Sequence, residues 1–200
     1  MNDSLPSELD PPADQVTDAN PIVTLPYNRP VFLVGMMGAG KTTLGRHLAR
    51  ALGREFVDLD HELEARCGVR VALIFDIEGE EGFRRRETAA LDDCSQREDI
   101  VLATGGGAVL APENRQMLQE RGVVVYLKAS ADELYRRVAR DRNRPLLQTA
   151  DPRERIRTLL QQRAPLYESV ADFTFETGTM SIPQAIRALV AMLQKHEVHS

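Results

Sequence analysis

The sequence predicts an α/β fold, a five-stranded parallel sheet with helices on both faces. Five short runs are rich in apolar residues, which is typical of strands in a covered parallel sheet. Helical stretches separate consecutive runs, as the crossovers between parallel strands require. The first run leads through a glycine-rich segment directly into a helix. A chain of 200 residues is long enough for one such domain.

The predicted strands share aliphatic or aromatic side chains and cover residues 31–34, 55–58, 100–103, 123–127 and 173–175. The predicted helices cover residues 41–52, 61–67, 71–78, 80–95, 112–121, 132–140, 151–163 and 182–196. Leu44, Leu48 and Leu52 recur at a four-residue spacing and indicate one apolar face of the first helix. Gly53 follows that face at once and predicts the end of the helix.

The first 30 residues differ in composition from the rest of the chain. They hold six of the eleven prolines, five acidic residues and one basic residue, so their net charge is −4. A segment with so few large apolar side chains cannot bury enough surface to fold. We expect residues 1–30 to be a disordered acidic, proline-rich tail, with a docking role as the alternative. Residues 31–200 are expected to form a single domain.

The charge and hydropathy of the chain exclude several classes of protein. The formal net charge is −5, whereas binders of nucleic acids or anionic membranes normally carry a basic excess. No apolar run is long enough to span a bilayer, and the N-terminus lacks the basic and apolar regions of a secretory signal. Cys67 and Cys94 do not have the C-x-x-C spacing. We therefore expect a cytoplasmic protein with two reduced thiols and no nucleic-acid or membrane partner.

Residues 35–42 fit the phosphate-binding pattern G-x-x-x-x-G-K-[ST] and lie between a predicted strand and a predicted helix. The glycines let backbone amides surround a phosphate, and the helix N-terminus adds partial positive charge. Lys41 is placed to reach the β- and γ-phosphate oxygens, and the Thr42 hydroxyl is placed to ligate Mg²⁺. No N-K-x-D sequence follows, so a guanine-specific switch protein is not expected. The predicted ATP-binding residues of this loop are Gly38, Ala39, Gly40, Lys41, Thr42 and Thr43.

Two carboxylates, Asp58 and Asp60, follow the second predicted strand. On an extended backbone, residues i and i+2 point the same way, so both side chains are expected to face the cleft beside the phosphate loop. One carboxylate near Mg²⁺ holds its water shell, and one near an acceptor hydroxyl orients it and takes its proton. The alternative is that Asp60 merely caps the helix predicted to begin at His61.

Two further segments indicate an acceptor site. Arg84 and Glu87 share one helix face, so the acid can hold the guanidinium in one rotamer. The neighbouring arginines at 85 and 86 are expected to lie on a solvated face. Gly105, Gly106 and Gly107 follow the third predicted strand and leave room for a ligand against bare backbone, with a simple tight turn as the alternative.

An arginine-rich polar stretch, residues 136–144, stands out in an acidic protein and predicts contact with anions. The alternative is a basic, solvated turn. We expect a mobile lid over about residues 137–150, hydrated when open and paired with phosphate when closed. Closure of such a lid would exclude water from the reaction.

With these motifs in view, the chain resembles the bacterial shikimate kinases, which belong to the P-loop kinases with a nucleoside monophosphate kinase-like fold. The matching segments are GMMGAGKTTLGRHLA at 35–49, FVDLD at 56–60, the I-F-D-x-E-G-E-x-x-F-R-x-x-E pattern at 74–87, ATGGGAV at 103–109, RNRPLL at 142–147 and RAPLYE at 163–168. The resemblance implies MgATP-dependent phosphorylation of the shikimate 3-hydroxyl. The products are shikimate 3-phosphate and ADP, within the biosynthesis of chorismate and the aromatic amino acids.

The resemblance also implies roles for the residues that bind the acceptor and the metal. Asp60 matches the aspartate that binds the acceptor hydroxyls and acts as base, and Asp58 matches the one that reaches Mg²⁺ through water. Arg84 and Arg163 match the arginines that hold the shikimate carboxylate, and Glu87 matches the acid that positions Arg84. The glycines at 105–107 match the segment that lines the shikimate pocket.

Two further arginines match residues on the nucleotide side. Arg144 resembles a catalytic lid arginine that reaches the phosphates, and Arg137 resembles the arginine that stacks on adenine. The segment at 177–183 matches the family weakly, so no adenine contact is assigned there. The tail at 1–30 has no counterpart in the family core.

These features together predict a monomeric small-molecule kinase with shikimate and ATP as its partners and Mg²⁺ as its cofactor. The nearest alternatives are a gluconate kinase and a nucleoside monophosphate kinase, which share the phosphate loop. A nucleotide-binding regulatory protein that has lost catalysis is the alternative from another class. The intact Lys41, Thr42, Asp58 and Asp60 argue against it.

Overall fold

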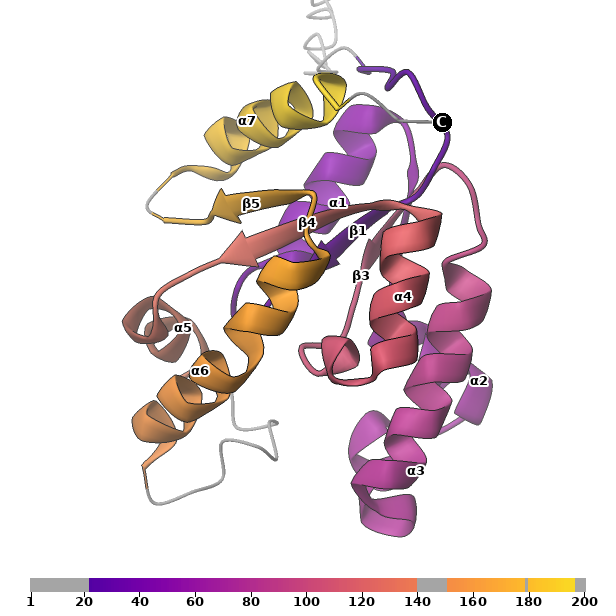
Figure 1. The fold of residues 1–200 in the computed structure, drawn as a ribbon, viewed down its shortest axis with the longest axis vertical. Coiled ribbons are helices and arrows are strands. Elements are labelled where there is room, and N and C mark those ends of the chain that lie inside the picture. The colour runs from indigo at the N-terminus through magenta and orange to yellow at the C-terminus, as the bar shows by residue number, and fades with distance from the viewer. Residues whose placement is uncertain (1–21, 140–150, 179, 197–200) are drawn as a thin grey trace, which may run out of the picture.

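The computed structural model describes residues 22–139, 151–178 and 180–196. Within these residues the chain forms one five-stranded sheet in the order β2-β3-β1-β4-β5, in which every neighbouring pair is parallel (Figure 1). The strands are β1 (Val31–Val34), β2 (Glu55–Asp58), β3 (Ile100–Ala103), β4 (Val123–Lys128) and β5 (Phe173–Glu176). The predicted fold class is therefore confirmed.

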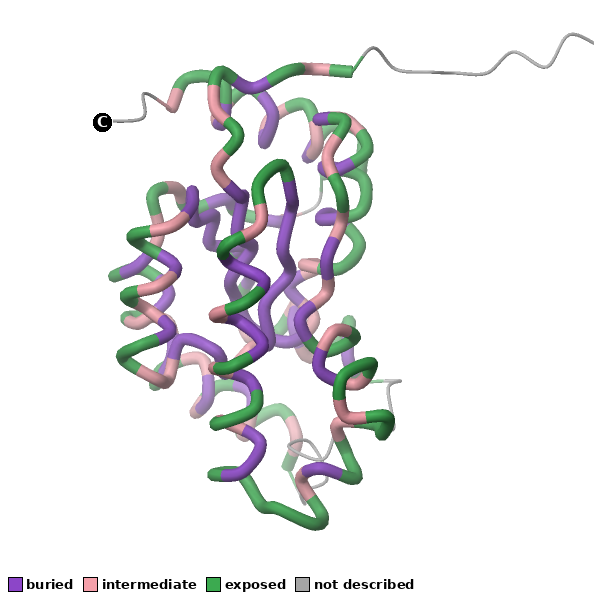
Figure 2. The backbone as a smooth tube through the Cα atoms, turned by 90° about the vertical axis from the view of Figure 1, so that its right-hand side faces the viewer, coloured by how far each residue is buried: buried purple, intermediate pink, exposed green. Residues whose placement is uncertain are grey.

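The helices lie on both faces of this sheet (Figure 1). They are α1 (Lys41–Leu52), α2 (Leu59–Cys67), α3 (Val71–Cys94), α4 (Pro112–Arg121), α5 (Ala131–Val138), α6 (Pro152–Val170) and α7 (Ile182–Gln194), with a 3₁₀ turn, η1 (Ala108–Leu110), before α4. Helix α1 packs on β2 and β3 with α7 beside it, whereas α4 and α6 pack on β4 from the other face. Buried residues concentrate between these layers, along the central strands (Figure 2).

Several helix boundaries differ from the sequence predictions, and two of them, in α6 and α2, bear on the cavity described below. Helix α6 continues to Val170, past the predicted end at residue 163, with Pro165 inside it. Helix α2 begins at Leu59 rather than His61, because the Asp58 carboxylate accepts the Asp60 backbone N–H and caps the helix there. The predicted break between 71–78 and 80–95 is real, since Gly79 inside α3 has φ 69° and ψ −174° and separates two helical arms.

The segment 22–30 packs on the domain, so the predicted tail boundary at residue 30 is wrong. The Val23 N–H donates to the Ala51 carbonyl at 2.9 Å, and Leu25 is buried in the core. The Tyr27 hydroxyl donates to the Leu193 carbonyl at 3.2 Å, and burial raises the Tyr27 pKa to about 12. Alternate apolar side chains at 23, 25 and 27 therefore anchor the segment. The rest of the predicted tail, residues 1–21, lies outside the described residues.

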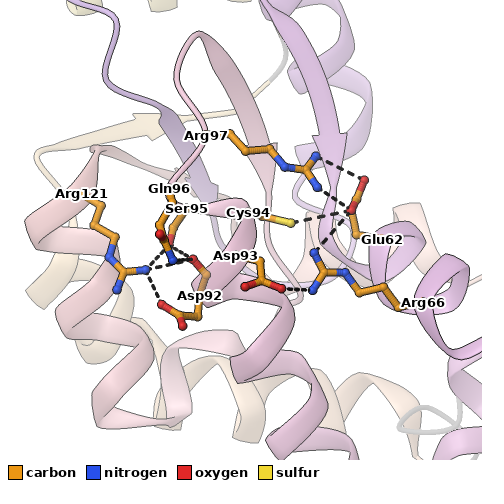
Figure 3. A network of polar contacts seen from close by, with 9 residues as sticks. All are labelled: Glu62, Arg66, Asp92, Asp93, Cys94, Ser95, Gln96, Arg97 and Arg121. Carbon is orange, nitrogen blue, oxygen red and sulfur yellow. Dashed lines mark hydrogen bonds and ion pairs between the residues drawn. The ribbon is translucent and has the colours of Figure 1, made fainter.

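A polar network fixes α2 and α4 to the C-terminal end of α3 (Figure 3). Arg97, in the loop before β3, donates to Glu62 of α2 at 2.9 Å. Arg66 of α2 pairs with Asp93 of α3, and Arg121 of α4 pairs with Asp92 at 2.6 Å. Because α2 and α3 carry Asp60 and Arg84, the network fixes the helices that bear these two predicted site residues relative to each other.

The cysteines are free thiols, as predicted. Cys94 is buried in the network of Figure 3, and burial raises its pKa. None of the helices in the described ranges is both long and apolar enough to cross a membrane.

Leu25→Ala is expected to lower the free energy of unfolding by about 2 kcal/mol or more, because it removes a core side chain and leaves a cavity. Urea denaturation measures the change. Ile22→Ala is the control, since Ile22 is 68% exposed, and it is expected to cost less than about 1 kcal/mol. If neither variant changes the free energy of unfolding, residues 22–30 do not contribute to the domain and the tail extends to residue 30, as predicted.

Candidate active site

A cavity of about 350 Å³ opens where three parallel strands end. Strand β1 leads into the phosphate loop, β2 ends at Asp58, and β3 leads into Thr104. Because parallel strands end at the same edge, these segments meet there. The cavity is lined by Met37, Gly38, Gly40, Lys41, Thr42, Thr43, Asp58, Asp60, Thr104, Gly106 and Arg137. Several predicted site residues from different parts of the chain therefore lie together.

The phosphate loop depends on glycine at positions where other side chains would be strained. Gly38 has φ 80°, and a Cβ there would lie 2.7 Å from the Val138 side chain. Gly40 has φ 97° and precedes α1 as its N-cap. The Lys41 ammonium donates to the carbonyl oxygens of Gly35 and Met36 at 2.7 and 3.0 Å. The loop is thus held around its own lysine at the N-terminus of a helix.

Thr42 and Asp58 meet at the wall of the cavity. The Thr42 hydroxyl donates to Asp58 Oδ2 at 2.9 Å. Asp60 lines the same cavity, as predicted, but it lies in the first turn of α2 rather than on an extended strand. The expected i, i+2 geometry is therefore wrong, and so is the alternative that Asp60 caps the helix, because Asp58 does so. Asp58 therefore lines the cavity from the end of β2, and Asp60 lines it from the first turn of the helix that Asp58 caps.

Arg84 and Glu87 form a largely buried ion pair on α3. Arg84 Nη1 lies 2.5 Å from Glu87 Oε2, and the Glu87 side chain is 1% exposed. Burial raises the Glu87 pKa, the Arg84 charge opposes that shift, and the nearby Asp60 charge adds to it. The neighbouring Arg85 points to solvent and pairs with Glu81, as the predicted solvated face requires. Glu87 thus fixes the direction of the Arg84 guanidinium, as the sequence pattern indicated.

The three glycines after β3 make room for protein atoms. A Cβ at Gly105 would lie 2.5 Å from Glu87 Oε1, and a Cβ at Gly107 would overlap the Arg84 guanidinium. A Cβ at Gly106 would lie 3.3 Å from the Met37 backbone nitrogen in the phosphate loop. Gly106 lines the cavity, whereas its two neighbours back onto the ion pair. The expectation that all three simply leave space for a ligand is therefore incomplete.

Helix α6 brings two side chains to the same glycine segment. Arg163 is 4% exposed, and its Nη1 donates to the Gly106 carbonyl at 3.2 Å. The Tyr167 hydroxyl donates to the same oxygen. Tyr167 was not predicted as a site residue, although a residue four positions after Arg163 lies on the same face of a helix. The signal was lost because the helix was predicted to end at residue 163.

Arg137 lies on the other side of the phosphate loop, near the end of α5. Its guanidinium donates to the Gly38 carbonyl at 3.3 Å, to Thr177 Oγ1 at 3.1 Å and to the Gly178 carbonyl at 3.2 Å. Thr177 was not predicted as a site residue, because its segment matched the family weakly. Arg144 and most of the predicted lid at 137–150 lie outside the described residues.

The comparisons with known proteins point to one family. The family model described as "Shikimate kinase" matches residues 37–194. The chain belongs to the shikimate kinase family. A curated shikimate kinase from Bordetella avium is 62% identical over 195 residues, which cover 98% of this chain and 93% of the relative. A second, from Bordetella pertussis, is 66% identical over 177 residues, which cover 88% of this chain and 84% of the relative.

Solved structures of the shikimate kinase family have the same fold. Shikimate kinase from Acinetobacter baumannii in complex with shikimate has a TM-score of 0.82 and 46% identity, and the match covers 86% of this chain and 96% of that chain. The enzyme from Aquifex aeolicus has a TM-score of 0.73 and 30% identity, with 82% of this chain and 96% of that chain covered. A gluconokinase from Sinorhizobium meliloti, 16% identical with a TM-score of 0.55 and coverage of 84% and 92%, shows the fold alone.

Gly105→Ala and Gly107→Ala are expected to differ in stability. The added methyl at Gly105 meets the buried Glu87 carboxylate, which has little room to move, so the free energy of unfolding falls by about 1–3 kcal/mol. The methyl at Gly107 meets the end of a long side chain, the Arg84 guanidinium, so the fall is expected to be smaller, and it comes from loosening of the Arg84–Glu87 ion pair. Urea denaturation of both variants measures the difference. Equal losses would show that the two glycines are constrained in the same way.

Proposed function

We propose that this chain transfers the γ-phosphoryl group of ATP to the 3-hydroxyl of shikimate, giving shikimate 3-phosphate and ADP. The observation that carries the proposal is that the phosphate loop and the two arginines, Arg84 and Arg163, lie on either side of the same glycine segment, residues 105–107. Gly106 lines the cavity beside the phosphate loop, and its carbonyl accepts from Arg163, while Gly107 lies against Arg84. An anion-binding loop therefore adjoins two arginines that suit a carboxylate.

On the nucleotide side, the backbone of residues 38–43 surrounds the phosphates at the N-terminus of α1. Lys41 leaves its carbonyl partners for the β- and γ-phosphate oxygens, where its charge meets the charge that develops during transfer. Arg137, exposed above Gly38, stacks on the adenine. Arg144, which lies outside the described residues, is proposed to contact the phosphates.

In the proposal, the Thr42 hydroxyl ligates Mg²⁺ and the Asp58 carboxylate reaches the ion through water. Their oxygens lie 2.9 Å apart, and both are hard donors of the kind that Mg²⁺ prefers. Mg²⁺ is held by few protein groups and mainly by phosphates and waters. This fits the described residues, which contain no cluster of three or more His, Cys, Asp or Glu side chains. Mg²⁺ held by these residues would neutralise charge on the phosphates of ATP.

On the acceptor side, Asp60 orients the 3-hydroxyl and accepts its proton. The hydroxyl oxygen forms a bond to the γ-phosphorus, the bond from that phosphorus to the β,γ-bridging oxygen breaks, and ADP keeps the electron pair. Arg84 and Arg163 hold the shikimate carboxylate with paired N–H groups, and Glu87 keeps Arg84 aimed at it. Catalysis then depends on positioning and on neutralising charge.

The proposed enzyme works as a monomer in the cytoplasm without nucleic-acid or membrane partners. The net charge of −5 supports the proposed absence of nucleic-acid and anionic-membrane partners, because the chain offers no basic excess for a polyanionic surface. Its partners are then the two small substrates.

The release of ADP with different acceptors tests the proposal. Shikimate, gluconate, AMP and CMP are offered separately with MgATP in a coupled assay. Turnover with shikimate alone is the expected result. Turnover with gluconate or a nucleotide would replace the proposed acceptor, and turnover with none would favour a regulatory protein that binds nucleotides.

Asp60→Asn is expected to lower kcat by about 10²- to 10⁴-fold, because the amide cannot accept the hydroxyl proton in the same way. The affinity for ATP should change little. Asp58→Asn should instead raise the Mg²⁺ concentration needed for half-maximal activity, since it weakens the proposed metal site. Steady-state kinetics over a Mg²⁺ series separates the two effects. Interchangeable variants would contradict the division of roles.

Arg84→Ala is expected to raise the KM for shikimate by about 10- to 100-fold, with the KM for ATP nearly unchanged. The loss follows because hydrogen bonds to a charged group contribute about 1.5–3 kcal/mol. Arg84→Lys should recover part of the loss, since an ammonium keeps the charge but lacks the planar fork.

Arg85→Ala is the matched control, because Arg85 lies one residue away on the exposed face and pairs with Glu81. It should be nearly silent. An Arg84→Ala enzyme that spares shikimate but binds ATP more weakly would contradict the assignment of the carboxylate site.

A further inference from the structure

The carbonyl oxygen of Gly106 is shared by two donors from one helix. Arg163 Nη1 donates to it at 3.2 Å, and the Tyr167 hydroxyl donates to the same atom. Both side chains come from α6, one helical turn apart. Among the described contacts, these two from α6 are the donors that reach this oxygen. The proposed function uses Arg163 but gives Tyr167 no role.

The surroundings of the Tyr167 side chain restrict its hydroxyl to one position. Its side chain is fully buried, and its ring stacks on Tyr126 of β4 with the centroids 5.0 Å apart. Burial raises its pKa well above the usual range, so the phenol keeps its proton and remains a donor. A stacked, buried ring has little freedom to follow a moving partner.

The position of the Gly106 peptide matters to both halves of the site. It lines the cavity, and its α-carbon lies so close to the phosphate loop that a Cβ would be 3.3 Å from the Met37 nitrogen. The preceding Thr104 is tied to the Leu33 carbonyl through its backbone N–H and its hydroxyl, both at 3.1 Å. The glycine segment is therefore hydrogen-bonded to α6 at Gly106, and the residue before it, Thr104, is hydrogen-bonded to β1.

We infer that Tyr167 is a positioning residue that keeps the Gly106 carbonyl hydrogen-bonded when Arg163 turns its guanidinium to the acceptor carboxylate. This inference rests on the proposed function, in which Arg163 binds that carboxylate. With Tyr167 present, Arg163 leaves an oxygen that still has a donor. Without the hydroxyl, binding the acceptor either removes the remaining donor of the carbonyl or holds Arg163 back.

Tyr167→Phe is therefore expected to raise the KM for shikimate by about 3- to 10-fold, the loss that corresponds to one neutral hydrogen bond. The values of kcat and of the KM for ATP should stay within about twofold, because the lost hydrogen bond lies on the α6 side of the glycine segment, while Thr104 remains tied to β1. A purely structural role would lower the thermal midpoint without this selective effect on one KM.

Tyr126→Phe is the matched control, since it removes the hydroxyl from the other ring of the same stacked pair. It should leave the KM for shikimate within about twofold of the wild type. Thermal midpoints of both variants are measured alongside the kinetics. An unchanged KM in Tyr167→Phe, or an equal rise in both variants, overturns the inference.

Amide hydrogen exchange gives a readout that does not depend on turnover. Exchange in peptides covering residues 104–108 should be faster in Tyr167→Phe than in the wild type or in Tyr126→Phe. If the wild type does not phosphorylate shikimate, the proposed function fails, and exchange alone decides whether Tyr167 positions this segment. Identical exchange in all three proteins then overturns the inference.

Discussion

The backbone of residues 105–107 is the part of the molecule on which both halves of the site depend. It runs from the end of β3 between the phosphate loop and the Arg84–Glu87 pair, with α6 closing the remaining side. The phosphate loop and the Arg84–Glu87 pair approach so closely that a Cβ on these glycines would crowd them. The distance between the phosphate loop and Arg84 is therefore set by main chain without side chains, which has fewer degrees of freedom than a side-chain contact.

Much of the fold could be predicted because its three central strands are buried on both faces. Runs such as Val31–Val34 and residues 123–127 are apolar throughout, and only a covered parallel sheet suits them. The boundaries that were predicted wrongly depend on tertiary contacts. Nothing local shows that α6 passes Pro165, and residues 22–30 are held by contacts with α1 and α7, which are distant in sequence.

The candidate site could be predicted in its chemistry more than in its geometry. The phosphate loop and the Arg84–Glu87 spacing are local patterns, so their residues could be identified directly. Asp60 was placed in the right cavity for the wrong reason, because a strand and a capped helix both bring a side chain to that edge. Thr177 contacts Arg137, which is distant in sequence, so no local spacing indicates it, whereas the spacing of Tyr167 from Arg163 becomes informative only once α6 is known to pass Pro165.

The packed N-terminal segment has a consequence for the connectivity of the fold. Tyr27 donates to Leu193 near the end of α7, and its ring lies 6.1 Å from that of His196. The two ends of the described domain are thus neighbours at the edge of the sheet away from the cavity (Figure 1). A short linker could join them, and the chain could be reopened at a surface loop far from the glycine segment. The order of the strands in the sheet is then independent of where the polypeptide starts, and circular permutation should be tolerated.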